Sequence, residues 1–223
     1  MNKVVLLGVA GLLAATARAN TIAFNTFGPG DTYRANQGYN IAGASSQDGY
    51  ESTAAQFTSA ASGFLSQVDL GITNFTGGGL FNVFLYGDAG GMPNNASQVL
   101  IGSGTPSASF GVNNSVVSVS PITSVSLNLG STYWLVVKPG GTNVLDVWNL
   151  SLPSVPGSVD NSLDDSTWFA NNLGLPAFRL IVSQGPAVPE TADTIWLLLV
   201  SLMVLFGVHM WRARSARTQV CAH

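Results

Sequence analysis

Residues 20–187 hold carboxylates, hydroxyls, amides and indoles that could do chemistry, but they hold no imidazole and no thiol. Both histidines, His209 and His223, and the only cysteine, Cys221, come after this stretch. Without them the stretch cannot form a Ser-His-Asp or Cys-His nucleophilic site, or a metal site with imidazole or thiolate ligands. We therefore expect a non-catalytic protein and assign no catalytic residue.

Carboxylates are the groups that remain for acid–base chemistry. Glycoside hydrolysis uses two of them, and the closest pairs in sequence are Asp48 with Glu51 and Asp164 with Asp165. Adjacent residues of a strand point to opposite faces, whereas the two acids of a glycosidase must face one substrate. An extracellular hydrolase therefore ranks below the non-catalytic hypotheses.

The oxygen-rich segment 160–166 is the best candidate for a metal site. Asp160, Asp164 and Asp165 supply carboxylates there, and calcium binds six to eight oxygen ligands. The segment lacks the glycine and the terminal glutamate of an EF-hand loop. A turn rich in Asp and Asn, without any metal, explains the same composition. Calcium is thus an alternative, and no other cofactor is expected.

Three tryptophans between residues 20 and 187 could stack on a sugar ring. Trp134 lies in the nearly continuous apolar stretch 133–137, which predicts a core position. Trp148 and Trp168 border predicted loops, so they are the better candidates for ligand stacking. Packing in the core is the alternative for both.

The charge of residues 20–187 excludes another class of partner. Nine acidic and three basic residues give this stretch a net charge of −6. Such a surface repels phosphate backbones, so we expect no nucleic-acid partner.

The elements that would position these side chains are short β-strands. Runs of β-branched and aromatic residues alternate with Gly, Asn, Ser and Pro clusters, and no segment has a helical period of useful length. Val68, Leu70 and Ile72 have the period of a half-buried strand, and the glycines at 77–79 predict a hairpin into residues 81–86. Further strands are expected at 54–58, 116–119, 125–129, 133–138, 144–150 and 177–182.

This pattern predicts an all-β fold. Roughly seven or eight strands with turn signals between them, and no crossover helices, favour antiparallel pairing. The length fits one domain with a sizeable core. We expect an antiparallel β-sandwich of jelly-roll type that spans residues 20–187.

Residues 1–19 have the layout of an export signal peptide. A lysine and an apolar run precede Ala17-Arg18-Ala19, which is a small-x-small cleavage site. The composition turns polar at Asn20. We expect the secretion translocon and signal peptidase to act here, so that the mature chain begins at Asn20. An uncleaved anchor or a buried helix is the alternative.

Residues 188–217 form a tail of different character. A helix over the apolar run 195–211 would cover roughly 26 Å, slightly less than a hydrocarbon core of about 30 Å. The run therefore predicts a single transmembrane helix. A basic cluster at 212–217 would stay on the cytoplasmic side and place residues 20–187 outside. The residues expected to set this orientation are Arg212, Arg214 and Arg217.

The order of motif, span and basic cluster resembles the PEP-CTERM family of C-terminal sorting signals. The matching motif is Val188-Pro189-Glu190, and Thr191 stands where that family has a second proline. The related Val-Pro-Asp-Ser/Thr-Gly family gives a similar partial match. Either resemblance implies that an exosortase-type membrane protease processes the tail. A plain single-pass anchor is the alternative.

The region before the tail resembles the choice-of-anchor R domain of bacterial surface proteins. Members of that family carry varied anchors, PEP-CTERM among them, and the family implies no enzymatic activity. The resemblance covers nearly all of residues 25–182. The residues that carry it lie at 27–33, 55–57, 85–88, 90–93, 132–136 and 176–179.

These features together predict a non-catalytic exported surface or extracellular-matrix protein. It would enter the cell-envelope membrane and then reach the cell surface or the extracellular matrix through its tail. Extracellular polysaccharide is the expected partner there. The alternative is a surface-displayed module that binds carbohydrate or calcium.

Overall fold

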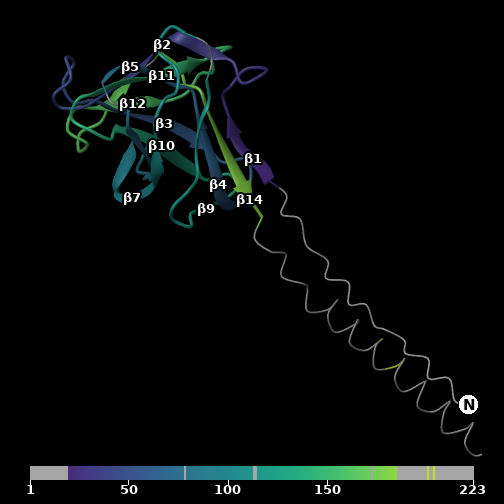
Figure 1. Ribbon diagram of the computed structural model, residues 1–223. Helices are drawn as coiled ribbons and strands as arrows, with labels where there is room; N and C mark the ends of the chain where they lie inside the picture. The colour runs from purple at the N-terminus through teal and green to yellow at the C-terminus, as the bar shows by residue number, and fades with distance from the viewer. Residues whose placement is uncertain are drawn as a thin grey trace, which may run out of the picture. The chain divides into compact units, whose positions relative to one another are not determined.

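A computed structural model describes residues 20–77, 79–112, 115–171 and 173–184, together with residues 200 and 203 (Figure 1). The chain divides into two compact units, of which Arg18–Gly185 is one. This unit contains all the strands of the described residues. They are β1 (Asn20–Asn25), β2 (Tyr33–Ala42), β3 (Ser52–Thr58), β4 (Gly63–Leu70), β5 (Ile72–Gly77), β6 (Phe81–Asp88), β7 (Pro93–Gly104), β8 (Val117–Val119), β9 (Ser126–Leu127), β10 (Thr132–Pro139), β11 (Val144–Ser151), β12 (Val159–Ser162), β13 (Phe169–Asn171) and β14 (Phe178–Ser183).

The strands form three sheets. The six-stranded sheet has the order β13-β12-β3-β10-β6-β7, and the three-stranded sheet has the order β2-β11-β5. The five-stranded sheet has the order β1-β14-β4-β8, with β9 also paired to β4. Each of these strand pairs is antiparallel. The predicted all-β antiparallel fold is confirmed.

One hydrophobic core joins the three sheets. Phe57 and Leu135 enter it from the six-stranded sheet, Phe178 and Val68 from the five-stranded sheet, and Trp148 from the three-stranded sheet. The Phe178 ring centroid lies 5.6 Å from that of Trp148 and 6.1 Å from that of Phe57. The inner faces of the sheets therefore pack on one another as the layers of a sandwich.

Val68, Leu70 and Ile72, which the sequence predicts to lie in one strand, are divided between two sheets at Gly71. β4 ends at Leu70 in the five-stranded sheet, and β5 begins at Ile72 in the three-stranded sheet. A Cβ on Gly71 would lie 3.0 Å from side-chain atoms of both Ala177 and Tyr33, so a larger residue would crowd this crossing. The predicted hairpin was wrong, because β5 pairs with β11 while β6 pairs with β10 and β7.

The other predicted strands are found close to their expected bounds, as β3, β8, β9, β10, β11 and β14. The strands that the sequence did not predict are β1, β2, β7, β12 and β13, and each contains asparagine. Asparagine is depleted in strands, so propensity alone points away from these segments. Pairing with neighbouring strands overrides that local preference.

The two predicted terminal segments fall outside the described residues. They are the signal peptide at 1–19 and the tail at 188–217, apart from Val200 and Met203, which are helical and exposed. Within the described part of the chain, no helix has the length and apolar character needed to cross a membrane.

Arg179 forms ion pairs with a buried and an exposed carboxylate, and the buried one links strands of the five-stranded sheet. Arg179 on β14 places Nη2 2.7 Å from Asp69 Oδ2 on β4 and Nη1 2.7 Å from Asp31 Oδ1. Asp69 is 1% exposed and also accepts hydrogen bonds from Gln67 and Ser118, both at 2.6 Å. The charge of Asp69 is therefore compensated inside the fold, and β14, β4 and β8 share the contacts that compensate it.

Asp146 on β11 is a second buried carboxylate, and it is less well compensated. Its side chain is fully buried; Oδ1 accepts a hydrogen bond from Asn74 Nδ2 at 2.9 Å, and Oδ2 has no partner within the described residues. Burial raises the pKa of Asp146 from 3.8 to about 6. At neutral pH the fold therefore carries a charge that burial penalises.

We predict that Asp146→Asn stabilises the full chain at pH 7 but not below about pH 4. The folded pKa lies above the unfolded one, so the native state gains stability as the pH falls from above 6 towards 4. The shift corresponds to a gain on the order of 3 kcal/mol in unfolding free energy at pH 7. Urea unfolding at several pH values measures it, with Asp48→Asn as the exposed-acid control. Equal stability of Asp146→Asn and wild type at pH 7 would contradict this prediction.

Candidate functional site

The outer face of the three-stranded sheet, turned away from the core, is hollowed into a groove of about 250 Å³. Strands β2, β11 and β5, which form this sheet, lie together at one end of the domain (Figure 1). Side chains from all three strands and from two loops surround the groove. They are Asn36, Gln37, Gly38, Asn40, Gln47, Asp48, Phe75, Phe110, Leu145 and Val147.

The floor of the groove is apolar and comes from β11. Successive side chains of a strand point to opposite faces, so Trp148 enters the core while Leu145 and Val147 line the groove. Gly38 on the adjacent β2 keeps the floor open. A Cβ on Gly38 would lie 2.4 Å from the Trp148 carbonyl oxygen and 2.6 Å from Val147 Cγ1. No larger residue fits there without displacing β11.

An aromatic pair forms one wall. The ring centroids of Phe75 and Phe110 lie 5.5 Å apart with their planes tilted by 56°, and Phe75 is 50% exposed. The backbone of Asn74 places both rings. Its N–H donates to the Ala108 carbonyl at 2.9 Å, and its carbonyl accepts from the Phe110 N–H at 2.8 Å. The Phe110 loop is thereby fastened alongside β5.

Amide side chains form the opposite rim. Asn36, Gln37 and Asn40 come from β2, and Gln47 and Asp48 come from the loop that follows it. Asn40 Nδ2 donates to Asp48 Oδ2 at 3.3 Å, and Gln37 Oε1 accepts from an arginine of the same strand at 3.2 Å. Each amide side chain carries N–H donors and a carbonyl acceptor, so the rim can donate hydrogen bonds to hydroxyl groups and also accept hydrogen bonds from them.

Two other hollows of the domain offer less for recognition. One of about 340 Å³ has no aromatic ring and no charged group in its lining, which consists of Ser154, Pro156, Gly157, Leu173 and Gly174. The other, of about 270 Å³, is lined by Leu163, Asp164, Thr167 and Phe169 and contains no amide side chain. Of these three hollows, the groove on the three-stranded sheet is the one that combines an aromatic wall with several amide side chains.

Trp148, a predicted stacking residue, is in the core and not at a ligand site. It is fully buried, its ring lies against Phe178, and its Nε1–H donates to the Ala177 carbonyl at 3.0 Å. No ring face is left for a sugar. The alternative expected from the sequence, packing in the core, is the one observed. β11 is buried along its whole length, so the tryptophan is not at a loop border.

Trp168, the other predicted stacking residue, lies on the outer face of the six-stranded sheet. Its ring meets Tyr86 edge-on at 6.2 Å, and its Nε1–H donates to Asn95 Oδ1 at 3.0 Å. It packs, partly buried, on a cluster that includes Trp134 and Val136. Trp148 and Trp168 are therefore on different sheets and do not form one platform.

The structure does not assemble Asp160, Asp164 and Asp165 into one metal centre. Asp160 belongs to β12, where burial raises its pKa. Asp164 Oδ1 accepts the backbone N–H groups of Thr167 and Ser166 at 2.7 and 2.8 Å, which holds its pKa well below the usual range. Among the residues described, no group of three His, Cys, Asp or Glu side chains could hold a metal ion.

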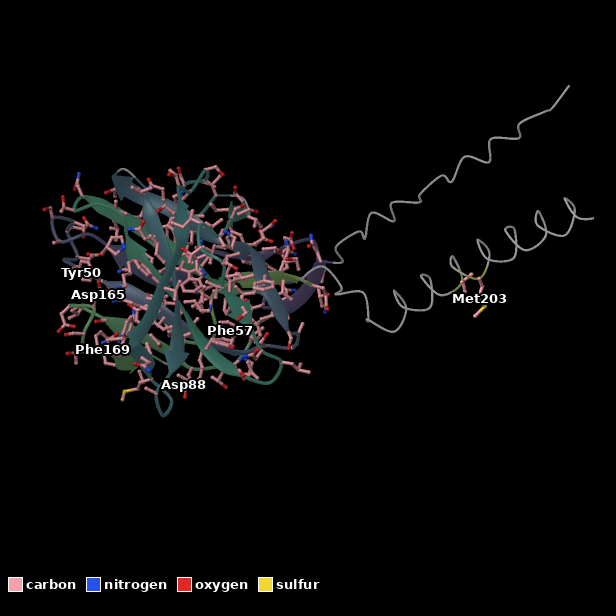
Figure 2. The ribbon with its side chains drawn as sticks, turned by 90° about the horizontal axis from the view of Figure 1, so that it is seen from below. Tyr50, Phe57, Asp88, Asp165, Phe169 and Met203 are labelled. Carbon is pink, nitrogen blue, oxygen red and sulfur yellow. The ribbon has the colours of Figure 1, made fainter. Side chains whose placement is uncertain are left out.

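Asp165 is part of an ionic cluster on the six-stranded sheet. Its carboxylate accepts hydrogen bonds from the Tyr50 hydroxyl and, at 2.7 Å, from Ser52 Oγ, while Lys138 Nζ lies 3.1 Å away. Figure 2 shows Tyr50 and Asp165 side by side. Burial, with the neighbouring carboxylate, raises the pKa of Tyr50. Lys138 Nζ also lies 4.9 Å from the Phe84 ring centroid. The charged groups of this cluster are therefore paired with one another and with neighbouring side chains.

The acid pairs considered for hydrolysis do not share a cavity. Asp48 lines the groove, but Glu51 does not, and its carboxylate accepts a hydrogen bond from Asn161 Nδ2 at 2.7 Å. Asp164 and Asp165 bond to separate partners, in the loop and on the sheet respectively. The predicted cleavage and sorting residues before Asn20 and after Gln184 lie outside the described residues.

Comparison with known proteins adds partial structural similarities. No protein-family model matches the sequence, and no curated protein matches it significantly. The cysteine protease and lectin-like domains of Cwp84, a surface-layer-associated protein of Clostridium difficile, match with a TM-score of 0.44 and 16% identity, covering 60% of this chain and 32% of that one. A variant of the same clostridial protease after propeptide cleavage matches with a TM-score of 0.41 and 15% identity, covering 60% and 36%. Similarities of this extent assign no function.

Sequence reasoning missed the groove because its parts are far apart in the chain. Phe75 and Phe110 are separated by two strands, and the amides belong to β2 and to the loop that follows it, neither of which the sequence predicts. One signal was available. Residues 36–48 hold two asparagines and two glutamines, and several amide side chains close together can supply a hydroxyl-binding rim.

We predict that EDTA leaves the thermal unfolding midpoint of the full chain unchanged. Asp164 Oδ1 already accepts two backbone N–H groups of its own loop, Asp164 Oδ2 accepts the Thr167 hydroxyl, and Asp165 forms an ion pair with Lys138. Thermal unfolding with and without chelator measures this. A midpoint that falls with EDTA and returns when calcium is added would restore the calcium site at residues 160–166.

Proposed function

We propose that the chain is an exported, non-catalytic surface module that binds carbohydrate in the groove of its three-stranded sheet. The observation that carries this proposal is the half-exposed aromatic wall of Phe75 and Phe110 facing amide side chains across an apolar floor. A pyranose has the complementary surface, because its C–H faces are apolar and its hydroxyls radiate from the ring edge. Ligand sites commonly combine an apolar surface with a few well-placed polar groups.

The polar rim favours a neutral glycan. Four of the five polar side chains that line the groove are uncharged amides, and Asp48 is the single charged one. A uronic acid or a phosphorylated sugar would meet Asp48 within a domain of net charge −6, which opposes its binding. Amides can both donate to and accept from hydroxyls, which neutral hexoses offer in quantity.

The groove lining also supports binding without hydrolysis. Two-carboxylate hydrolysis needs a second acid facing the same sugar, and Asp48 is the only acid among the lining residues. The lining likewise offers no nucleophile beside a base. A bound glycan would therefore be held and released intact.

Export and sorting complete the proposal. β1 begins at Asn20, directly after the predicted cleavage site, so signal-peptide removal would leave the sheet intact. The tail with Val188-Pro189-Glu190, the apolar run and the arginines would then sort the protein through an exosortase-type system. The displayed module would be a sandwich of jelly-roll type, since the chain crosses repeatedly between the sheets. Its place would be the cell surface or the extracellular matrix, on polysaccharide.

We predict that the full chain binds neutral glycans on an array and that Phe75→Ala weakens the binding about tenfold. The substitution removes the exposed ring of the wall while leaving the floor and the amides in place. Titration calorimetry with the best array ligand measures the affinity. Phe169→Ala is the matched control, because Phe169 is 46% exposed against 50% for Phe75 but lies on β13, outside the groove. Equal affinities of Phe75→Ala and wild type would remove the groove from the proposal.

A separate prediction concerns the tail. Replacing Pro189 and Glu190 together by alanine should leave membrane insertion intact, because neither residue belongs to the apolar run. Tail removal should stop, so the uncleaved protein accumulates in the membrane fraction of an exosortase-bearing host. An epitope tag after His223, followed by immunoblotting, reports both outcomes. Wild-type protein that keeps the tag at the cell surface would indicate a permanent single-pass anchor.

A further inference from the structure

Three apolar side chains are exposed at one end of the five-stranded sheet. Ile22 on β1 is 53% exposed, Phe64 on β4 is 47% exposed, and Leu129, in the turn after β9, is 66% exposed. We call these three residues the end patch. Side chains of this size are usually covered when they lie together.

Strand register places Ile22 and Phe64 on the same face of the sheet, one on each side of β14. Ile22 lies opposite Ile181 of β14, and Phe64 lies opposite Ser183 of the same strand. Ile181 and Ser183 face outwards, since the alternate residues of β14 are buried in the core. The backbone of Leu129 lies next to the start of β4, because its N–H donates to Ser62 Oγ at 2.9 Å.

The chain leaves the described part of the domain at this same end. Asn20, the first residue of β1, pairs with Ser183, the last residue of β14. The apolar run at 195–211 therefore follows the end patch after a short linker. Residues 185–194 would span about 35 Å even when fully extended. Insertion of that run would keep this end of the domain near the bilayer.

The segments that build this end carry no charge. Residues 20–25, 62–68, 126–130 and 180–184, which form the sheet around the end patch, contain no Asp, Glu, Lys or Arg. The nearest charges of the same sheet are Arg179 and its partners Asp69 and Asp31, which compensate one another. An anionic lipid surface would repel the acidic remainder of the domain, but here it would meet polar and apolar side chains and, after signal-peptide removal, the α-amino group of Asn20.

We propose that the end patch rests on the lipid surface of the bilayer that holds the C-terminal apolar run. This inference depends on the membrane insertion contained in the proposed function, and not on carbohydrate binding. Apolar side chains at such a surface enter the headgroup boundary, where each adds to the binding free energy in proportion to the area it buries. In Figure 1 the strands of the groove lie at the top of the domain, whereas β9 and the beginning of β1 lie towards its lower end. Docking therefore leaves the groove open to the outside.

The test is quenching by brominated lipid in the full chain. A Cys221→Ser background receives single cysteines by Phe64→Cys, Leu129→Cys, Met203→Cys or Ser45→Cys, each labelled with bimane. The proteins are placed in phosphatidylcholine vesicles, of which one set carries bromine on the acyl chains. Circular dichroism identifies the labelled variants that fold. If a label at position 64 disturbs the sheet, the label at position 129, which is exposed in a turn, still reports on the end patch.

The labels at 64 and 129 should lose emission in brominated vesicles, as should the label at 203, while the label at 45 should not. If the label at 203 is quenched and those at 64 and 129 behave like 45, the docking proposal is overturned and insertion stands. If the label at 203 is not quenched, insertion fails and the docking proposal fails with it. The labels at 64 and 129 could instead change emission with protein concentration and not with bromine. That result would overturn lipid docking and indicate that a second copy of the chain covers the end patch.

Discussion

The burial of Trp148 is the interaction on which the groove depends. Its ring fills the core against Phe178, and its Nε1–H bonds to the Ala177 carbonyl, so β11 is fixed to the start of β14. With that side of β11 fixed, the alternation of the strand sends Leu145 and Val147 to the outer face as the floor of the groove. One strand therefore connects the core of the sandwich with its candidate binding surface.

The same strand carries the main electrostatic cost of the fold. Asp146 points inwards between the two floor residues, and among the described residues its one hydrogen-bond donor is Asn74. Asn74 in turn bonds through its backbone to the segment that ends at Phe110, and Phe75 follows it directly. The buried Asp146 carboxylate thus fixes Asn74, whose backbone positions the two phenylalanines of the aromatic wall. Departures from good packing or pairing often lie beside functional sites.

The sequence predicted the elements whose signals are local. Runs of β-branched and aromatic residues located β10 and β11 to within a residue or so, and the lack of His and Cys in residues 20–187 already limited the chemistry of the domain. The sequence could not show that the chain changes sheet at Gly71, because the crossing is set by contacts with Tyr33 and Ala177, remote in sequence. The local sequence likewise indicates a loop border near Trp148, because the burial of all of β11 depends on its neighbouring strands. The groove draws on β2, β5, β11 and two loops, a combination that only the strand order brings together.

The most direct test of carbohydrate recognition by the groove is nitrogen-15 NMR of the full chain during titration with neutral oligosaccharides. The side-chain amide signals of Asn36, Gln37, Asn40 and Gln47 report on the rim, and those of Asn95 and Asn171, on the six-stranded sheet, are the internal control. The account predicts that the rim signals shift together and saturate while the control signals stay in place. Saturable shifts at Asn95 and Asn171 with an unchanged rim would contradict it.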